Sequence, residues 1–206
     1  MRHSIRVGRW MVLALVSGLL LSMGAPRAVR AQTPSDTAGP VHFANIPWGL
    51  SRAATRTAME AHGFRFLKID DDSDMVFKGA LLGDSTMLFA WMARGHLSRI
   101  SMALITDDDA AIPTYNQLKT SLTEKYGPPT GSIANFDEPF EAGDGYELTA
   151  IRTGKGHYLT IWMLKGRDHG GLSIDISKLL VVDVSYEADS WSAESKRRQA
   201  KAMRIF

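Results

Sequence analysis

The sequence predicts an α+β domain in which two helices pack on one or two antiparallel sheets and a further helix follows at the C-terminus. Two observations lead to this fold class. A capped helical pattern that ends at a glycine occurs twice, at residues 51–63 and 109–127. Each pattern is followed by apolar segments of strand length, separated by turn residues. The repeated order predicts a tandem repeat, with halves at about residues 42–106 and 107–190.

The first half opens with a short apolar lead-in and a capped helix. Ser51 is a good N-cap, and Gly63 stands where a left-handed C-cap is required. Trp48 lies just before the cap and is expected to cover the end of the helix. The small-residue face that we expect to be buried consists of Leu50, Ala54, Ala58 and Ala61.

Four strand-length segments follow this helix. They are residues 64–69, 75–82, 85–93 and 97–106. In the last segment, apolar and more polar residues alternate, which is typical of a strand with one buried and one wetter face. The two-residue link Gly83-Asp84 predicts a tight hairpin. Together these features favour an antiparallel meander.

The second half opens with the most regular helical pattern of the chain. Three acids, Asp107-Asp108-Asp109, stand where the positive end of a helix dipole favours them, and Gly127-Pro128-Pro129 ends the pattern. The residues expected on the buried face are Ile112, Tyr115, Leu118, Leu122 and Tyr126. If the repeat is real, Trp48 and Tyr126 should both lie near helix ends against the sheet.

The remaining segments predict more strands and a final helix. Residues 146–153 and 157–164 read as a hairpin around Gly154-Lys155-Gly156, and residues 172–176 and 179–187 as further strands. A helix is expected at residues 192–204, capped by Ser192, within a basic C-terminal segment at residues 191–206.

The first 31 residues have the composition of an export signal. Arginines precede an apolar run at residues 10–23, and small residues lead to Ala31. We expect a signal peptide over residues 1–31, cleaved after Ala31, and a flexible leader over residues 32–41. The mature protein would then be periplasmic or secreted, with no stable membrane span. A retained anchor is the alternative, but the apolar run falls short of the roughly 20 residues that cross a bilayer.

Composition excludes several classes of site. The 206-residue chain has no cysteine, which removes disulfides, thiolate catalysis and cysteine-ligated zinc. The predicted signal contains five arginines and no acid, so the rest of the chain has 19 Lys and Arg against 22 Asp and Glu. That balance leaves no global basic field for nucleic acid.

Packing and turn residues carry a resemblance to a known group of proteins. They are Phe43, Ile46-Pro47-Trp48-Gly49 and Ser51, followed by Tyr115, Leu118, Leu122 and Lys125-Tyr126-Gly127-Pro128. The pattern resembles small exported bacterial domains with the β-lactamase-inhibitor-protein-like fold. The resemblance covers roughly residues 43–187 and implies a helical pair on an antiparallel sheet, with a protein-binding role for the open sheet face. The lipid-attachment cysteine of the related assembly lipoproteins is missing, and residues 166–177 do not fit the simple ending expected.

The sequence offers two weak candidates for chemistry at turns. Asp70, Asp72 and Asp74 have the alternation of a calcium loop, but Met75 and Leu81 stand where that loop needs glycine and glutamate. A solvated turn explains the acids better. Gly83-Asp84-Ser85 resembles the nucleophile block of the Gly-Asp-Ser hydrolases, yet no histidine has an aspartate three residues before it. A hairpin turn is again the better interpretation.

Histidines provide no metal template, because they are scattered and none forms a close pair in the sequence. Asp168 could orient His169 in a glycine-flanked loop, but simple loop polarity is the better explanation, because adjacency in sequence is not evidence of pairing in space. We therefore predict no catalytic, cofactor-binding or metal-binding residues, and a protein that is not an enzyme.

Large apolar side chains supply the candidate interaction surface, which consists of Phe89, Trp91, Met92 and Trp162. The strand at residues 85–93 is apolar on both faces, so either a second layer covers it or one face is available to a partner. We favour covering by the other half or the terminal helix. The basic C-terminal segment could contact anionic lipid or acidic protein, although a solvated helix face is the simpler account.

The leading functional hypothesis is an exported protein-interaction module of the bacterial envelope that uses a sheet face or edge. The main alternative is a carrier of a small molecule or lipid, with an apolar cavity between helices and sheet. A hydrolase that uses Ser85 and His169 is a remote third hypothesis. The sequence identifies neither the partner nor the oligomeric state.

Overall fold

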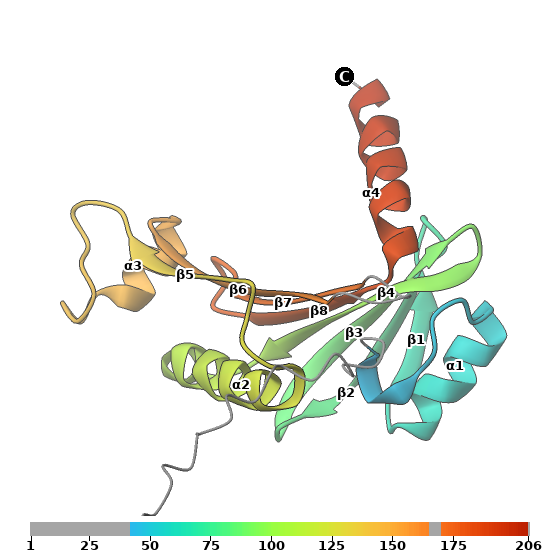
Figure 1. Cartoon of the computed structure of the whole chain (residues 1–206), viewed down its shortest axis with the longest axis horizontal. Helices are drawn as coiled ribbons and strands as arrows, with labels where there is room; N and C mark the ends of the chain where they lie inside the picture. Colours follow the sequence, from blue (N-terminus) through green and yellow to red (C-terminus); the bar gives the residue numbers. More distant parts are fainter. Residues whose placement is uncertain (1–41, 165–169, 206) are drawn as a thin grey trace, which may run out of the picture. The chain divides into compact units, whose positions relative to one another are not determined.

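The computed structural model of the chain describes residues 42–164 and 170–205. These residues form one eight-stranded antiparallel sheet with four α-helices, as Figure 1 shows. The α+β class, the antiparallel sheet and the terminal helix predicted from the sequence are therefore confirmed. The predicted signal peptide and leader, together with Asp168 and His169, lie outside the described residues.

The first half consists of a short 3₁₀ turn, one helix and a four-stranded meander. Its elements are η1 (Phe43–Asn45), α1 (Arg52–Ala61), β1 (Arg65–Ile69), β2 (Met75–Leu81), β3 (Asp84–Ala93) and β4 (His96–Ile105). All four predicted strands are present. The lead-in is tied to the meander, because Gly49 N–H donates to the carbonyl of Leu97 at 2.9 Å and Leu97 N–H donates to the carbonyl of Leu50 at 2.8 Å.

The second half repeats the helix and the four strands and adds a short helix between the first two strands. Its elements are η2 (Asp108–Ala110), α2 (Ala111–Tyr126), β5 (Gly131–Phe136), α3 (Glu147–Thr153), β6 (Gly156–Leu164), β7 (Gly170–Ile176) and β8 (Val182–Glu187). The chain continues with α4 (Asp189–Ala202) and η3 (Met203–Ile205).

The strand order β1-β2-β3-β4-β8-β7-β6-β5 places the two meanders side by side in one sheet, with their last strands, β4 and β8, adjacent. Within the sheet, β4 pairs with β8, and this seam joins the halves through register partners such as Ser101 and Ser185. Helices α1 and α2 both lie on the same face of the sheet (Figure 1). This topology is the one expected for two copies of a helix followed by four strands.

Residues 146–153 form helix α3 instead of the predicted strand. Glu147 lies in its first turn, Arg152 in its last turn, and Gly154 ends it with φ of 75°. These are ordinary helix-end signals, and they prevail over the apparent alternation of apolar residues. The helix packs closely on β6, since a side chain at Gly156 would meet the backbone nitrogen of Ile151 at 2.9 Å. Strand β5 was not predicted.

Helix α1 has the predicted ends but a different buried face. The Ser51 side chain accepts a hydrogen bond from Ala54 N–H at 3.4 Å, and Gly63 has φ of 85°. The fully buried residues are Thr55 and Met59, whereas Ala54 and Ala61 are exposed. The prediction of an alanine face was thus wrong by about one position around the helix, because the long Met59 side chain occupies the space over the sheet.

Two hairpins are closed by turns of the type expected between twisted strands. Leu82 and Gly83 both have positive φ in the β2–β3 link, and so do Arg94 and Gly95 in the β3–β4 link. Positive φ at both central residues is the signature of a type I′ turn. The first hairpin is therefore confirmed, with its turn one residue earlier than the sequence suggested.

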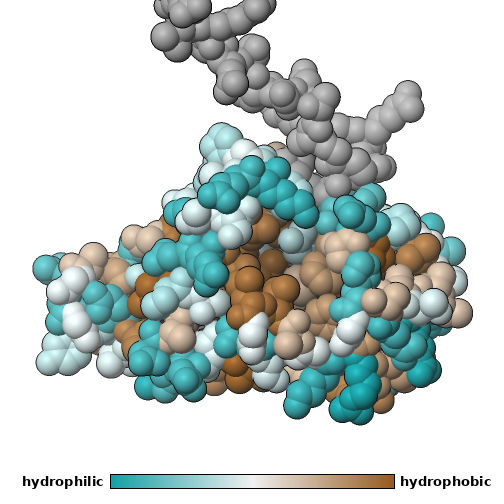
Figure 2. Space-filling model, turned by 90° about the horizontal axis from the view of Figure 1, so that it is seen from below, coloured by the Kyte–Doolittle hydropathy of each residue, from teal (hydrophilic) through white to brown (hydrophobic). Residues whose placement is uncertain are grey.

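The core lies between the sheet and the helices α1 and α2. The largest fully buried side chains include Trp162, Tyr115 and Phe77. Trp162 donates its indole N–H to the carbonyl of Gly127 at 3.0 Å, which satisfies the one polar atom of that side chain. Seen from the helix side, apolar side chains gather between the two helices and polar ones surround them (Figure 2).

Trp48 and Tyr126 hold the positions expected from the repeat. Trp48 stands just before α1, Tyr126 is the last residue of α2, and both are partly buried against the core. On α2, the predicted residues Tyr115, Leu118 and Leu122 are buried. The second helix is therefore the element whose packing the sequence predicts best.

Helix α4 is anchored on the acidic turn between β1 and β2. The Asp74 carboxylate, 1% exposed, forms a bidentate ion pair with Arg198 and accepts a hydrogen bond from Met92 N–H at 2.7 Å. Asp72 pairs with Lys201 at 2.9 Å. The run 70–74 is thus a turn, as predicted, but the basic segment is not simply a solvated face: Arg198 is largely buried in this contact.

Candidate binding surface

The outer face of the sheet, defined as the face opposite α1 and α2, carries two rows of side chains across the strands. The first row consists of Val76, Phe89, Ser101, Ser185, Ser173 and Ile161. The second row consists of Lys78, Met87, Ala103, Asp183, Asp175, Leu159 and Ile133. Both rows have small or acidic residues at their centre and larger apolar residues on either side.

Only two of the four predicted interaction residues lie on this face. Phe89 and Trp91 are partly buried there, with ring centroids 6.3 Å apart. Met92 and Trp162 are 3% and 1% exposed and belong to the core on the helix side. Their assignment to an exposed surface is corrected, because strand alternation directs them toward the helices.

Helix α4 covers the Trp91 end of the outer face. Trp191 meets Trp91 edge-on at 5.6 Å between ring centroids, and the guanidinium of Arg198 lies 5.2 Å from the Trp191 ring. Arg99 contacts the same two rings and pairs with Glu187 at 3.2 Å. The terminal helix therefore shields one end of the surface, and the rest of it lies beyond α4.

Two aspartates face each other at the centre of the second row. Asp175 of β7 and Asp183 of β8 are register partners. Burial raises the pKa of both carboxyls, and the charge of Asp175 contributes to raising the pKa of Asp183 to about 6. Arg99 opposes both shifts but is itself bonded to Glu187 and Ser185. Among the described residues, no hydrogen bond or ion pair holds either carboxylate.

Like charges directly opposite on neighbouring strands destabilise a sheet. Groups whose pKa values are shifted by burial and by a neighbouring charge cluster at functional sites. The Asp175 and Asp183 pair is therefore the strongest functional signal on the outer face.

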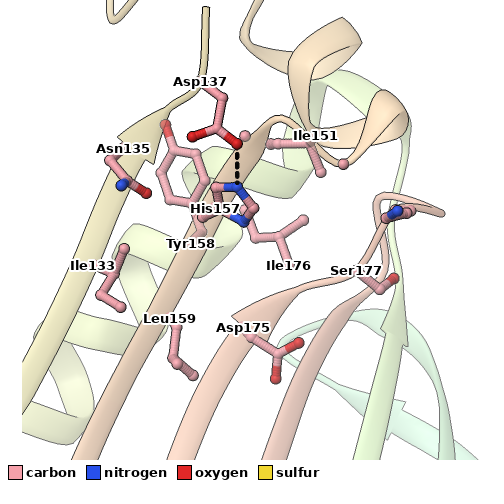
Figure 3. A pocket seen from close by; sticks show the side chains of 13 residues that line it. Ile133, Asn135, Asp137, Ile151, His157, Tyr158, Leu159, Asp175, Ile176 and Ser177 are labelled. Atoms are coloured by element: carbon pink, nitrogen blue, oxygen red, sulfur yellow. Dashed lines mark hydrogen bonds and ion pairs between the residues drawn. The ribbon is translucent and has the colours of Figure 1, made fainter.

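A pocket of about 700 Å³ adjoins this pair near α3, where β5 and β7 end and β6 begins (Figure 3). Ile133, Leu159 and Ile176 contribute apolar wall, and Asp175 lies on the side toward β8. Lys178 also lines the pocket, beside Gly154 at the end of α3. The pocket thus combines apolar walls with charges of both signs.

Asp137 and His157 form a hydrogen-bonded pair at the α3 end of the pocket. His157 Nε2 lies 3.2 Å from Asp137 Oδ2, as the dashed line in Figure 3 shows. Both side chains are about half exposed. This is the one aspartate–histidine pair among the described residues, and sequence reasoning missed it because 20 residues separate the two positions.

Other predicted positions do not come together into a site. Ser85 lies on the β2–β3 hairpin, and no hydrogen bond to a histidine is found for it within residues 42–164 and 170–205. In the same part of the chain, no group of three or more His, Cys, Asp or Glu could hold a metal ion. Nor does any described helix combine the length and the apolar character that crossing a membrane requires.

The carrier hypothesis predicted an apolar cavity between helices and sheet, but that space is filled by packed side chains. Side chains such as Met59, Tyr115 and Leu118 pack there against the sheet as part of one buried cluster. The described pocket lies instead at the strand ends beside α3. A carrier function would therefore need this second location.

The pairing of the two acids does not follow from the predicted strands. A two-residue turn between residues 172–176 and 179–187 would place Asp175 opposite Leu180, whereas the structure pairs Asp175 with Asp183. The observed register depends on a longer turn in which Leu180 adopts a φ of 59°. Comparisons with protein-family models, with curated proteins and with solved structures find no match for this chain.

Proposed function

We propose that the protein is an exported, non-enzymatic interaction module that binds a partner protein on the outer face of its sheet. The partner places a cationic side chain between Asp175 and Asp183. The observation that carries this proposal is the pair of opposed carboxylates with raised pKa and no bonded partner among the described residues.

Charge complementarity defines the chemistry of the contact. Two carboxylates that repel each other in the free protein would both be stabilised by one lysine or arginine, and an arginine could bond to the two groups at once. The relief of repulsion on binding adds to the attraction. A partner surface with an unpaired basic residue is therefore favoured over an acidic or purely apolar one.

The surroundings of the pair suit a protein surface. Ser101, Ser185 and Ser173 form a central row of small side chains, in which Ser185 is buried beside Arg99, and Phe89 and Ile161 flank the row with apolar area. A polar centre with partly exposed apolar flanks can exclude water around a central ion pair. The antiparallel ladder holds these side chains on a rigid platform.

A site-specific photo-crosslinking experiment in cells tests the proposal. A photoreactive residue at Ile161 reports on the outer face, and one at the exposed Glu124 on α2 serves as the position control. We expect a discrete crosslinked partner from position 161 and none from position 124. The purified complex should weaken as salt concentration rises, because an ion pair at a partly exposed site is screened.

The charge variants give the decisive comparison. Asp175→Asn with Asp183→Asn should reduce capture from position 161 by about tenfold or more, as expected when a paired interfacial charge is removed. Asp71→Asn with Asp109→Asn makes the same change in net charge at two exposed positions away from the outer face and should leave capture intact. Equal capture by both double variants, or capture from position 124 alone, would refute the proposal.

A small-molecule carrier is the second candidate, and the pocket beside Asp175 is the observation in its favour. Pockets of several hundred Å³ with a few convergent polar groups are the usual size for such ligands. Native mass spectrometry of the purified mature protein should then show a retained ligand. A variant with Leu159→Trp, which would fill the pocket, should lose that ligand.

A further inference from the structure

The two edges of the sheet differ in how they resist pairing with another strand. Edge strand β1 carries Arg65 and Lys68 and has a register shift between Phe66 and Lys68. Charges and bulges of this kind are the ordinary protection of an edge. Strand β5, the opposite edge, has the uncharged sequence Gly-Ser-Ile-Ala-Asn-Phe, and its first five residues are exposed. Of the two edges, β5 is the one open to an added strand.

The phase of the β5–β6 ladder identifies the free backbone groups. Asp137 N–H donates to the carbonyl of Lys155 at 2.7 Å just beyond the strands, so the odd-numbered residues of β5 bond toward β6. The even-numbered residues Ser132, Ala134 and Phe136 therefore direct their N–H and C=O groups outward. Among the described strands, β5 pairs with β6 alone.

Side chains on β5 connect this edge to the pocket. Ile133 and Asn135 line the pocket, together with Asp137 just after the strand (Figure 3). A strand added to β5 would place every second side chain on the outer face, beside these residues. Its other side chains would face the α2 side, where Lys119 donates to the Ser132 hydroxyl at 2.8 Å.

We propose that β5 is a strand-addition site, and that its occupant is an extended segment of the partner protein with basic residues at alternate positions. This inference rests on the proposed function and identifies how the partner is held. Main-chain bonds from Ser132, Ala134 and Phe136 bind the segment. Its basic side chains reach the pocket near Asp137 and Asp175, while uncharged polar side chains lie beside Lys119.

Charge decides between this occupant and a second copy of the chain. The pocket beside β5 contains Asp137 and Asp175, with His157 and Lys178 as the basic groups facing them, and Asp183 lies on the next strand. The β5 strand of a second copy has no basic residue to bring to these carboxylates. A segment with basic residues at alternate positions complements them.

Amide hydrogen exchange with a defined peptide tests the site directly. The probe is a blocked nonapeptide of alternating lysine and threonine, and the control peptide has glutamate in place of lysine. We expect the lysine peptide to slow exchange of the Ser132, Ala134 and Phe136 amides by about tenfold or more and the glutamate peptide to leave them unchanged. Protection by both peptides alike, or by neither, would overturn the inference.

Two variants at one position separate backbone pairing from side-chain effects. Ala134→Pro removes an N–H that faces the open edge and leaves the bonds to β6 in place, so the fold should be retained. It should weaken peptide binding by about tenfold, since one hydrogen bond is lost and the proline ring hinders pairing. Ala134→Ser keeps the N–H and should bind like the parent. If Ala134→Pro unfolds the protein, Ala134→Lys replaces it in the test. This variant puts a charged side chain on the edge strand β5, as Arg65 and Lys68 do on β1.

The outcomes distinguish this inference from the proposed function. If neutralising Asp175 and Asp183 abolishes partner capture but Ala134→Pro and Ala134→Lys do not, the outer-face function stands and strand addition is refuted. If neither kind of variant affects capture, both proposals fall. A dimer in sedimentation that Ala134→Lys dissociates would show that a second copy occupies the edge and would refute the partner segment.

Discussion

The two halves of the sheet share one topology and use their charged residues differently. In the first half, Asp74 is buried and bonded to Arg198. In the second half, Asp175 and Asp183 lie on the outer face without a bonded partner among the described residues. A repeated fold thus places acids in both halves, but Asp74 of the first half holds the molecule together, whereas Asp175 and Asp183 of the second remain available.

Helix α4 strengthens this contrast. Hydrogen bonds from Arg197 and Arg198 lower the pKa of Glu194 to about 2, whereas burial raises the pKa of Asp183 to about 6. Glu194 therefore contributes stability that is present above pH 4.5 and is lost as the pH falls toward 2. The contribution of Asp183 to stability has the opposite pH dependence, since it is present at low pH and is lost as the pH rises through 6. Glu194 and Asp183 therefore differ in the direction of their pKa shifts, because hydrogen bonds from arginine lower the first and burial raises the second.

The largest expected effect comes from breaking the anchor in the first half. Asp74→Ala leaves Arg198 buried without its carboxylate and removes the acceptor of the Met92 amide, so we expect a loss of about 3–5 kcal/mol in the free energy of unfolding. Urea denaturation measures it. The exposed Asp71→Ala is the matched control, with an expected change below about 0.5 kcal/mol. Similar losses in the two variants would show that the contact does not anchor α4.

A smaller effect is expected from the buried hydroxyl network in the second half. The Tyr115 hydroxyl lies 2.6 Å from the Thr160 hydroxyl, which in turn lies 2.9 Å from that of Ser132. Tyr115→Phe should lower the free energy of unfolding by about 1–2 kcal/mol. Tyr126→Phe removes a longer, 3.5 Å contact to the carbonyl of His42 and should cost less. A reversed order would mean that the network adds little to the stability of this half.

Neutralising an acid of the outer face should stabilise the protein. Asp183→Asn removes the repulsion with Asp175, and we expect a gain of about 1 kcal/mol in the free energy of unfolding at pH 7. Partial exposure of the carboxyl screens the repulsion, so the gain should fall well short of what its pKa shift would imply for a fully buried group. The exposed Asp109→Asn should have no comparable effect.

The pH dependence of that gain has a definite sign. Because the pKa of Asp183 rises from 3.8 to about 6 on folding, the folded state binds the proton more tightly than the unfolded chain. The contribution of this group to stability is full below pH 4 and is lost as the pH rises through 6. Thermal denaturation from pH 4 to 7 should show this decline in the parent protein and a flatter profile in Asp183→Asn. Identical profiles would contradict the pKa shift.

The smallest expected change in stability concerns the guarded edge. Replacing Arg65 and Lys68 of β1 by threonine should alter the free energy of unfolding by less than about 0.5 kcal/mol, because both side chains are exposed. It should nevertheless raise self-association, measured by light scattering, since the edge loses its charge. If self-association does not change, the register shift in β1 protects this edge without help from the charges.

Much of the fold could be predicted because local signals agreed with tertiary packing. The spacing of Tyr115, Leu118 and Leu122 matches the buried face of α2, and Gly83 marks a true turn. Strand β5 was missed because its six residues include one aliphatic residue larger than alanine and one aromatic. Helix α3 was misread because alternation was weighed above Glu147 and Gly154, whose positions signal helix ends.

The candidate site was harder to predict than the fold because its parts come from separate strands. Asp175 and Asp183 become a pair only once the register of β7 and β8 is known. Asp74 and Arg198 are 124 residues apart, and no local rule links them. The predicted surface erred at Met92 and Trp162 because large apolar side chains are equally typical of a core.

The β4–β8 seam also has a consequence for the speed of folding. Each meander can form from neighbouring strands, but pairing Ser101 with Ser185 must close a loop that contains nearly the whole second half. Closing a loop of that length costs conformational entropy before the hydrogen bonds between β4 and β8 can stabilise the sheet. The halves should therefore acquire structure early, and the joining of the two meanders should limit the rate at which the native sheet appears.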